Sequence, residues 1–437
     1  MRYFFLLFCF FTSSAWPAEI LSDLKAKRYP RLNQELETMF LNFREGGISE
    51  REFGQVLQPF ALSDLALEDL ISAWLKKQPN TWQAHLAAGI YYHHLAWLNR
   101  GADYIGNTSA IQVRYMKSYQ TKATAYLTRV TVLEPKLSHA WAYLINLAML
   151  TGDSDEIKRL YQQAKRQTPN SFLLHWNYAT AISPKWGGSM KALMDFSQQM
   201  EIESKDWSNL RVLIGYQDYA AAEIAWRKHS DKDSALGHLQ KAFQYGETMS
   251  YLNLKARILS ASKNYDKAEM LYQRSLELDK MNTDALVGLA WTYFNQKQYR
   301  QGLENANRAL SLEPLLPKAL AIRARIYSRI ERPSEALADL GQIAQYGVMS
   351  HSLYRLQGKL FFYNEKDYQS AEIAYRYAAE LKPSDERAWY FLMASRYMLK
   401  DCRYVDAAKR FVNLCKQGAS CEERDLSWSK QNLTCAF

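Results

Sequence analysis

Glycine and proline are scarce in this sequence of 437 residues, which contains only 18 Gly and 11 Pro. Collagen-like, loop-rich and disordered chains need far more of both residues, so these classes are excluded. Hydrophobic residues make up 48% and charged residues 23% of the sequence, which is the composition of a protein with a continuous apolar core. Because the length exceeds that of one compact core, we expect several domains or, preferably, one elongated stack.

Signatures of catalysis and of cofactor binding are also missing. The sequence has no phosphate-cradling glycine loop, no histidine-glutamate zinc helix and no glycine-bracketed nucleophilic serine. Adjacent His93 and His94 point about 100° apart on a helix, and His85 lies two turns before His93, so a shared metal is not expected. We predict no catalytic residue, no cofactor and no metal, with these histidines at the surface or in a groove.

Long apolar runs are absent as well. A membrane-spanning helix needs about 20 apolar residues, and no run in this sequence is that long. The chain begins with Arg2, an apolar run at 3–11 and the small residues Ser13, Ser14 and Ala15. This order is typical of a secretory signal peptide, which we place at 1–15, with a membrane anchor as the less favoured alternative. We therefore expect an exported protein without a transmembrane segment after cleavage.

Cysteine is missing between residues 10 and 401, and Cys402, Cys415, Cys421 and Cys435 remain after cleavage. An even, clustered number in an exported chain predicts two disulfides rather than a zinc site, whose close cysteine pairs are absent. A helix predicted at 404–414 would hold Cys402 and Cys415 about 15 to 20 Å apart, too far for the Cα spacing of about 4.4 to 6.8 Å in a disulfide. A nested arrangement (415–421, 402–435) and a crossed one remain, and we predict the nested one because the crossed one needs a nearly straight chain.

The C-terminal half repeats itself at a spacing of about 34 residues. The segment around Tyr265 returns around Tyr368, and the sequence Gln-Tyr-Gly at 244–246 returns at 345–347. Both offsets are close to three such repeat lengths. Each unit is predicted to be a helix, a turn and a helix, with starts near Ser138, Tyr216, Met249, Thr283, Pro317, His351 and Glu386.

The repeat that starts at Thr283 resembles the tetratricopeptide repeat (TPR) family. The matching residues are Leu286, Leu289, Ala290, Tyr293, Tyr299, Gly302, Ala306, Ala309 and Pro314. The resemblance implies an all-α, right-handed helix-turn-helix solenoid, in which small residues let the paired helices approach each other. Neither helix of a pair buries its apolar face alone.

The N-terminal half is less regular, with helices expected at 31–44, 49–57 and 63–76. A degenerate repeat follows, with helices at 82–95 and 118–133 and an insertion at 97–116 between them. The motifs Trp97-Leu98-Asn99-Arg100-Gly101 and Pro184-Lys185-Trp186-Gly187-Gly188-Ser189 are similar to those of a bacterial family of unknown function, over about residues 30–200. This resemblance implies a bacterial protein and no activity. Together with the predicted signal peptide, it leads us to expect a periplasmic or extracellular location.

Five segments result from these patterns. We predict a signal peptide at 1–15, an N-terminal helical cap at 19–81, divergent TPR-like helices at 82–215, a regular TPR array at 216–415 and a cysteine-containing capping tail at 416–437.

The Arg100 and Trp186 motifs allow two interpretations. Arginine and glycine backbone amides suit anions, so Arg100, Gly101, Trp186 and Gly187 would make a small anion pocket. Turn packing, with Trp186 filling a gap, is the favoured interpretation.

The resemblance also places a concave groove along the inner face of the first helices. Its predicted cations outnumber its single acid, Asp284, and aromatic residues lie between them. The predicted groove residues are Arg227, Lys228, Asn253, Arg257, Trp291, Phe294, Lys318, Arg325, Arg329, Arg355, Lys359, Phe362, Tyr363, Arg387, Tyr390 and Tyr397. Asn253 and Arg257 are the expected grips for a carboxylate.

Three functions follow, in order of preference. The first is an exported protein–protein interaction scaffold whose groove binds an acidic or carboxylate-ended segment, which the net charge of +10 also favours. The second is a module of a polysaccharide-handling or secretion complex that binds anionic polysaccharide. The third is an enzyme near Arg100 and Trp186. Export argues against nucleic acid as a partner.

Overall fold

The computed structural model describes residues 16–62, 65–100, 108, 110–345 and 349–435, and within these ranges it contains helices and no strand. The chain divides into two compact units, Met1–Asn282 (unit 1) and Thr283–Phe437 (unit 2). The predicted signal peptide at 1–15 and Gly101 lie outside the described residues. Among the residues described, no helix combines the length and the apolar character that crossing a membrane requires.

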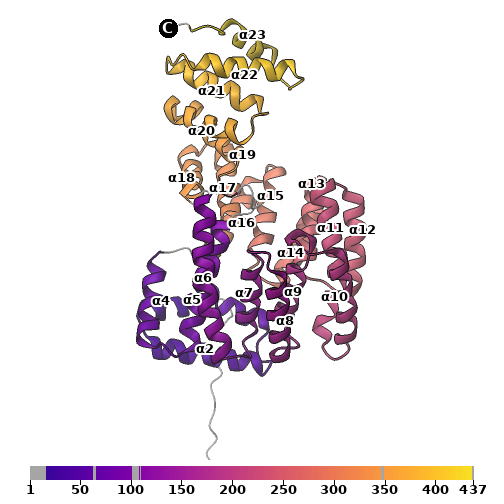
Figure 1. Ribbon diagram of the computed structural model, residues 1–437. Helices are drawn as coiled ribbons and strands as arrows, with labels where there is room; N and C mark the ends of the chain where they lie inside the picture. Colours follow the sequence, from indigo (N-terminus) through magenta and orange to yellow (C-terminus); the bar gives the residue numbers. More distant parts are fainter. Residues whose placement is uncertain (1–15, 63–64, 101–107, 109, 346–348, 436–437) are drawn as a thin grey trace, which may run out of the picture. The chain divides into compact units, whose positions relative to one another are not determined.

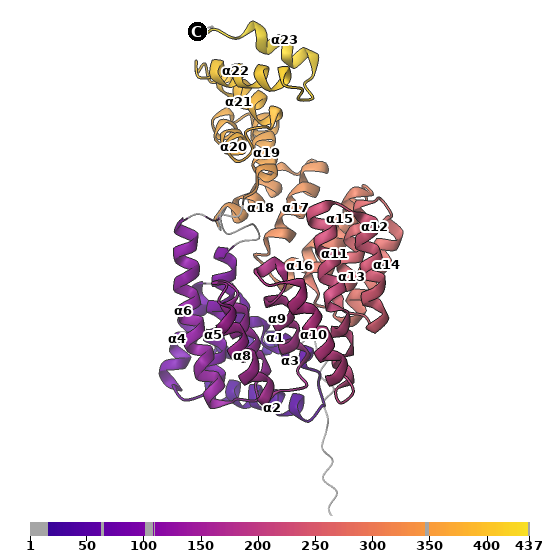
Figure 2. The same ribbon diagram turned by 45° about the vertical axis from the view of Figure 1, so that its right-hand side comes forward.

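Unit 1 consists of antiparallel helices joined by short turns (Figures 1 and 2). Its helices are α1 (Trp16–Lys25), α2 (Tyr29–Arg44), α3 (Glu50–Val56), η1 (Gln58–Ala61), α4 (Leu65–Lys77), α5 (Trp82–Arg100), α6 (Ala110–Leu133), α7 (Ser138–Ala148), α8 (Ser154–Gln167), α9 (Phe172–Ala181), η3 (Pro184–Trp186), α10 (Met190–Glu203), η4 (Ser208–Gly215), α11 (Tyr216–His229), α12 (Lys232–Ala242), η5 (Phe243–Tyr245), α13 (Met249–Ala261) and α14 (Tyr265–Leu278).

Unit 2 is a stack of helix pairs that follow one another toward the C-terminus (Figure 1). Its helices are α15 (Thr283–Asn295), α16 (Tyr299–Leu312), α17 (Pro317–Arg329), α18 (Pro333–Gln345), α19 (His351–Leu360), η6 (Phe361–Glu365), α20 (Tyr368–Leu381), α21 (Glu386–Met398), α22 (Tyr404–Lys416) and α23 (Glu423–Gln431).

The predicted all-α repeat architecture is confirmed. The repeats expected from the sequence spacing begin at the predicted residues, which are the first residues of α7, α11, α13, α15, α17, α19 and α21. Alanines that fit between paired helices, such as Ala268, Ala336, Ala371 and Ala407, are fully buried. Because these small side chains let the backbones approach, each pair buries apolar faces that neither helix could bury alone.

The turn between the two helices of a repeat carries a residue with positive φ. Lys263, Lys297, Glu331, Lys366 and Lys400 occupy this place, with φ between 53° and 62°. They recur at the same interval along the sequence except between Glu331 and Lys366, where one extra residue is present. The π-helical turn η6, Phe361–Glu365, accommodates the extra residue at the end of α19, as such turns commonly do.

Part of the predicted insertion at 97–116 is helical, whereas the flanking helices were expected to end at 95 and to begin at 118. Helix α5 continues to Arg100 and α6 already begins at Ala110, so the extra residues lengthen the two helices of this pair. The pair is tightly packed, because a Cβ at Gly89 of α5 would lie 2.6 Å from the side chain of Leu127 on α6. The remaining part of the insertion, 101–107 and 109, lies outside the described residues.

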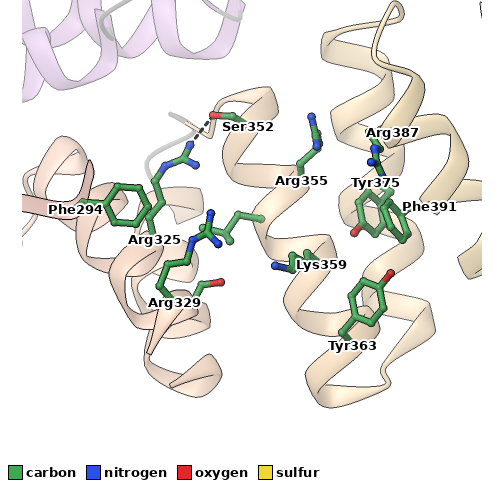
Figure 3. Close-up of a pocket in the computed structure, with 12 residues that line it drawn as sticks. Phe294, Arg325, Arg329, Ser352, Arg355, Lys359, Tyr363, Tyr375, Arg387 and Phe391 are labelled. Carbon is green, nitrogen blue, oxygen red and sulfur yellow. Dashed lines mark hydrogen bonds between the residues drawn. The ribbon is translucent and has the colours of Figure 1, made fainter. Parts of the chain in front are cut away.

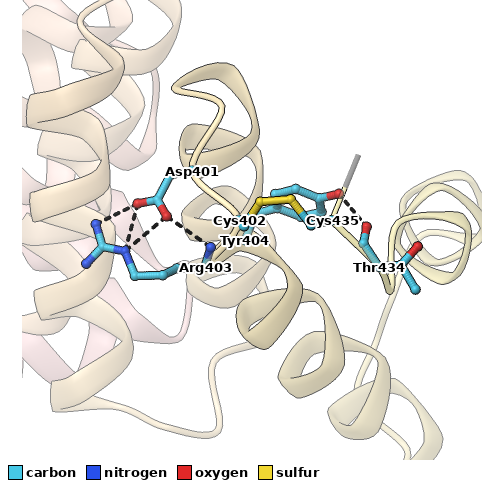
Figure 4. Close-up of a disulfide and its surroundings, with 6 residues drawn as sticks. All are labelled: Asp401, Cys402, Arg403, Tyr404, Thr434 and Cys435. Carbon is cyan, nitrogen blue, oxygen red and sulfur yellow. Dashed lines mark hydrogen bonds and ion pairs between the residues drawn. A yellow bond between two sulfur atoms is a disulfide. The ribbon is translucent and has the colours of Figure 1, made fainter. Parts of the chain in front are cut away.

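Two disulfides join the C-terminal tail to the last helix pair, and Figure 4 shows the one between Cys402 and Cys435. Cys402 pairs with Cys435 and Cys415 pairs with Cys421, at Cα–Cα distances of 5.2 and 5.7 Å. This is the nested arrangement predicted from the length of the helix between Cys402 and Cys415. The hydroxyl of Tyr404 donates a hydrogen bond of 2.6 Å to the carbonyl of Thr434 beside the outer disulfide.

Candidate functional site

The candidate site is a cavity of about 700 Å³ in unit 2. The first helices of successive repeats, α15, α17, α19 and α21, supply most of its wall, with η6 and α20 adding the rest. Figure 3 shows basic side chains from α17, α19 and α21 around this space. The lining residues are Phe294, Arg325, Ser328, Arg329, Ser352, Arg355, Leu356, Lys359, Tyr363, Tyr375, Arg387 and Phe391.

Helix periodicity places the cations in pairs on the wall. Arg325 and Arg329 are four residues apart on α17, and Arg355 and Lys359 are four residues apart on α19. Like charges at this spacing lie on one helix face and destabilise the helix by a few tenths of a kcal/mol. No acidic residue is among those that line the cavity. The fold therefore gathers positive charge here at a small cost in stability.

Arg325 is the most enclosed of these cations. Its guanidinium donates to the hydroxyl of Ser352 at 2.8 Å and lies 5.5 Å from the ring centre of Trp291. Its Nε is buried and has no hydrogen-bond partner among the residues that the structure describes. Burial, followed by repulsion from Arg355, lowers the pKa of Arg325. Both effects disfavour the charged guanidinium, so an anion in the cavity would stabilise it.

The other cations differ in how far they are neutralised. Arg355 lies 3.2 Å from the carboxylate of Asp385, which also contacts His351 and caps α21 by accepting from the backbone N–H of Arg387. Within the described part of the chain, neither Arg329 nor Lys359 has a carboxylate within 4.0 Å, and both side chains are exposed. Arg325, Arg329 and Lys359 thus form the uncompensated positive charge of the cavity.

Aromatic rings complete the wall. Tyr375 and Phe391 stack with ring centres 5.2 Å apart, and Phe294 comes from α15. Tyr363, on the π-helical turn, leaves 55% of its surface exposed. These rings offer apolar area next to the cations.

The structure brings part of the predicted groove together. Phe294, Arg325, Arg329, Arg355, Lys359, Tyr363 and Arg387 line the cavity. Arg227, Lys228 and Arg257 are exposed residues of unit 1, where Arg227 pairs with Glu223 at 3.1 Å.

Asn253 differs from the prediction of a carboxylate grip. It is only 6% exposed, and its amide nitrogen lies 3.5 Å from Oδ1 of Asn282. The side chain therefore faces the interior of unit 1, where it meets Asn282 in the turn that follows α14.

The remaining predicted groove residues of unit 2 lie outside the cavity lining. Trp291 lies against Arg325, and Lys318 forms an exposed ion pair with Asp284 at 3.3 Å. Phe362 packs against the rings of Tyr368 and Phe391. Tyr390 and Tyr397 both contact Trp428 of the tail helix, at 6.1 and 5.3 Å between ring centres, so they are covered rather than open.

The sequence prediction missed several lining residues. Ser328, Ser352 and Leu356 belong to the same helix faces as the predicted cations, one turn away from Arg325, Arg355 and Lys359, respectively. Tyr375 lies on the second helix of its pair, where no groove residue was expected. It reaches the cavity because Gly358 of α19 lets the Tyr375 ring pass close to the backbone, where a Cβ would be 2.8 Å from the ring.

The Arg100 and Trp186 motifs meet in unit 1, although they are far apart in the sequence. Trp97 and Trp186 contact each other edge-on with ring centres 5.3 Å apart, and the guanidinium of Arg100 lies 5.9 Å from the Trp186 ring. Gly187 has a φ of +91°, and Ser189 caps α10 by accepting from the N–H of Ala192. These contacts correspond to the turn-packing interpretation.

The histidines named from the sequence make different contacts, although His94 contributes to the lowered pKa of its neighbour His93. His93 lies 3.3 Å from the side chain of Asn146 and 4.7 Å from the Tyr143 ring, and burial lowers its pKa to about 3. His85 contacts the carbonyl of Pro79. Within the described residues, no cluster of His, Cys, Asp or Glu could hold a metal ion.

Three family models match parts of the chain. The model described as a domain of unknown function (DUF4034) matches residues 17–168, that of the anaphase-promoting complex, cyclosome, subunit 3 matches 261–343, and that of the tetratricopeptide repeat matches 360–385. The chain is therefore an all-α protein with tetratricopeptide repeats. Its N-terminal part is similar to the domain of unknown function. A comparison with curated proteins finds no match.

Several solved structures are similar to part of the chain. PilF of Pseudomonas aeruginosa is 14% identical, over 51% of this chain and 96% of that one, with a TM-score of 0.43. MamA is 18% identical over 37% and 95%, with a TM-score of 0.34. YrrB, described as a TPR protein with an unusual peptide-binding site, is 17% identical over 44% and 97%, with a TM-score of 0.36.

Proposed function

We propose that the chain is an exported interaction scaffold whose cavity in unit 2 binds an acidic or carboxylate-ended segment of a partner protein. Tetratricopeptide repeats are typically scaffolds for protein interactions, which supports the general class. The observation that carries the specific proposal is the uncompensated charge of Arg325, Arg329 and Lys359, gathered around one cavity without an acidic lining residue.

The chemistry of the cavity suits carboxylates. Guanidinium groups form charge-assisted and often bidentate hydrogen bonds with carboxylates. An arriving carboxylate would also relieve the repulsion between Arg325 and Arg355, which adds to its binding. The rings of Phe294, Tyr363 and Phe391 supply apolar contact area for the rest of the segment. A volume of about 700 Å³ is within the range of sites that hold a few side chains or a small ligand.

An anionic polysaccharide is the second candidate. The observation that favours it is the Tyr363 ring, which is 55% exposed and lines the same cavity as Lys359. Aromatic rings can pack on sugar rings while cations bind uronate groups. Binding of an oligogalacturonate, with no binding of an acidic peptide, would favour this candidate over the first.

The test compares two charge reversals in unit 2. R329E/K359E changes two exposed cavity cations that have no acidic partner within the described residues, and K366E/K400E changes two exposed turn residues outside the lining. Glu331 already occupies the equivalent turn position with φ of 60°, so the control is compatible with the backbone. Arg355 is left unchanged because its reversal would place a carboxylate beside buried Asp385.

Binding of a fluorescent hexaglutamate peptide is then measured by anisotropy at low salt. We expect R329E/K359E to weaken binding at least about tenfold and K366E/K400E to change it little. Thermal unfolding of both variants should be nearly unchanged, since exposed substitutions shift stability by about 0.5 kcal/mol or less. Equal binding by wild type and R329E/K359E would refute the site. Export is tested separately, because N-terminal sequencing of the protein from a bacterial periplasm should begin at Trp16.

A further inference from the structure

The tail helix α23 and the residue before it, Glu422, bring acidic side chains to a cation of the cavity wall. Glu422 forms an ion pair with Arg387, which lines the cavity, and Asp425 lies 4.0 Å from the same guanidinium. Arg387 is therefore the cavity cation that the chain neutralises with its own tail. The pairing repeats, inside the molecule, the chemistry proposed for the partner segment.

Asp425 is a buried carboxylate, with 4% of its surface exposed. Burying a charge is costly unless it is paired and hydrogen-bonded. Its partners are Arg387 at 4.0 Å, Arg424 at 3.8 Å and the hydroxyl of Tyr390, whose pKa is raised by burial and by the hydrogen bond to Asp425. A helix that only covered the apolar end of a repeat stack would need no buried carboxylate.

Trp428 anchors the same face of α23. Its ring contacts Tyr390 and Tyr397, and it packs on the apolar cluster of the last helix pair. Glu422, Asp425 and Trp428 are spaced three residues apart, so they lie along one side of the helix. Acidic and aromatic groups of α23 thus match basic and aromatic groups of α21.

Disulfides hold α23 in this place. Cys421, two residues before the helix, is bonded to Cys415 near the end of α22. Cys435, beyond the helix, is bonded to Cys402, two residues before α22 (Figure 4). A free helix of nine residues is not stable in water. Tethering both ends gives the segment a high effective concentration, so contacts that would be weak between separate molecules suffice.

We propose that Arg387, Tyr390 and Tyr397 continue the binding surface of the cavity, and that this continuation recognises a helical segment with two acidic residues and an aromatic anchor. Helix α23 fills it as an internal ligand and competes with a partner for Arg387. The inference rests on the proposed function and names the kind of partner. A partner that binds only to the cavity meets the three uncompensated cations, and one that displaces α23 gains Arg387 and the two tyrosines.

The test removes the acidic contacts of α23 one at a time. E422Q removes the negative charge that pairs with Arg387. E423Q is the control, because it removes a negative charge from the neighbouring exposed residue. We expect E422Q and D425N each to bind hexaglutamate about three- to tenfold more tightly than wild type, because a larger fraction of Arg387 is available. E423Q should bind like wild type. If E422Q, D425N and E423Q have equal affinities, the internal-ligand proposal is wrong.

Hydrogen exchange of the α23 amides gives a readout that does not depend on the probe. If Glu422 and Asp425 hold the helix on Arg387, exchange in α23 should be faster in E422Q and D425N than in E423Q. Unchanged exchange would overturn the proposal even where hexaglutamate binds. Absence of hexaglutamate binding to every variant, with faster exchange in α23, would instead reject the proposed function and leave α23 docked by its carboxylates.

Discussion

Glu372 on α20 and Arg396 on α21 form a buried ion pair between two helices that both contribute to the cavity wall. Nε of Arg396 donates to Oε1 of Glu372 at 3.0 Å, and Nη2 lies 2.8 Å from the same oxygen. The two side chains are 11% and 7% exposed. The pair joins the helices that carry Tyr375 and Arg387 of the cavity. In E372Q the guanidinium would remain buried without a counter-charge. Loss of one partner from a buried pair costs about 3–5 kcal/mol, and we expect about 2–3 kcal/mol because glutamine still accepts a hydrogen bond.

The same helix provides a matched control. Glu380 pairs with Arg376 at 3.2 Å, but these side chains are 55% and 38% exposed. E380Q therefore makes the same chemical change in solvent and should cost less than about 0.5 kcal/mol. The double variant E372L/R396M replaces the buried pair with apolar side chains of similar volume, which is often neutral or stabilising. It should regain most of the stability that E372Q loses.

Urea unfolding of the full chain, followed by circular dichroism, measures these differences. Hydrogen exchange in α20 and α21 locates them, since a solenoid can open one repeat at a time. An E372Q variant as stable as E380Q would show that Arg396 is solvated in solution and that the pair is not a buried one. A double variant as unstable as E372Q would show that packing, rather than an unpaired charge, determines the loss.

Three further predictions concern packing, pH and the disulfides. Gly358→Ala places a Cβ 2.8 Å from the Tyr375 ring and should cost about 1–3 kcal/mol in urea unfolding, whereas Gly341→Ala, in open space on α18, should gain up to about 1 kcal/mol. Burial lowers the pKa of His93 to about 3 in the folded chain, whereas a histidine in the unfolded chain has a pKa of about 6.5. Between these two values the unfolded chain binds more protons than the folded chain, so stability falls as the pH falls from about 6.5 toward 3. H93Q should flatten this slope by up to about 1.4 kcal/mol per pH unit, and an unchanged slope would contradict the burial of His93. Non-reducing peptide mapping should find Cys402 linked to Cys435 and Cys415 linked to Cys421, while four free thiols would contradict the disulfides.

The repeat array could be predicted because its information is local and periodic. A helix pair has nearly the same length in every repeat, so a single sequence period placed the first residues of α7 and of the later first helices. The N-terminal half lacks this period, and there the extent of α5 and α6 was underestimated. Their extra turns depend on the long contact between the two helices, which a repeat of standard length does not contain.

The site could be predicted only in part. The faces of the helices follow the sequence period, but the segments that pack over those faces do not. The inner faces of α17 and α19 identified Arg325, Arg329, Arg355 and Lys359. The cysteines predicted a capping tail at 416–437, but nothing local shows that its helix covers Tyr390 and Tyr397. The local sequence also does not show that Asp385, at the start of the following repeat, neutralises Arg355. These contacts join segments that a repeat pattern treats as separate.

The π-helical turn Phe361–Glu365 is also the place where this array can change length. One added residue normally rotates all following side chains of a helix by about 100°. Here the wider turn takes up the residue, so α20 keeps its pairing with α19 while Tyr363 stands in the cavity. A related chain that lacked the residue would keep the stack and lose or move this ring. Variation in length and variation in ligand preference would then arise from the same short turn, without a change in any helix that holds the array together.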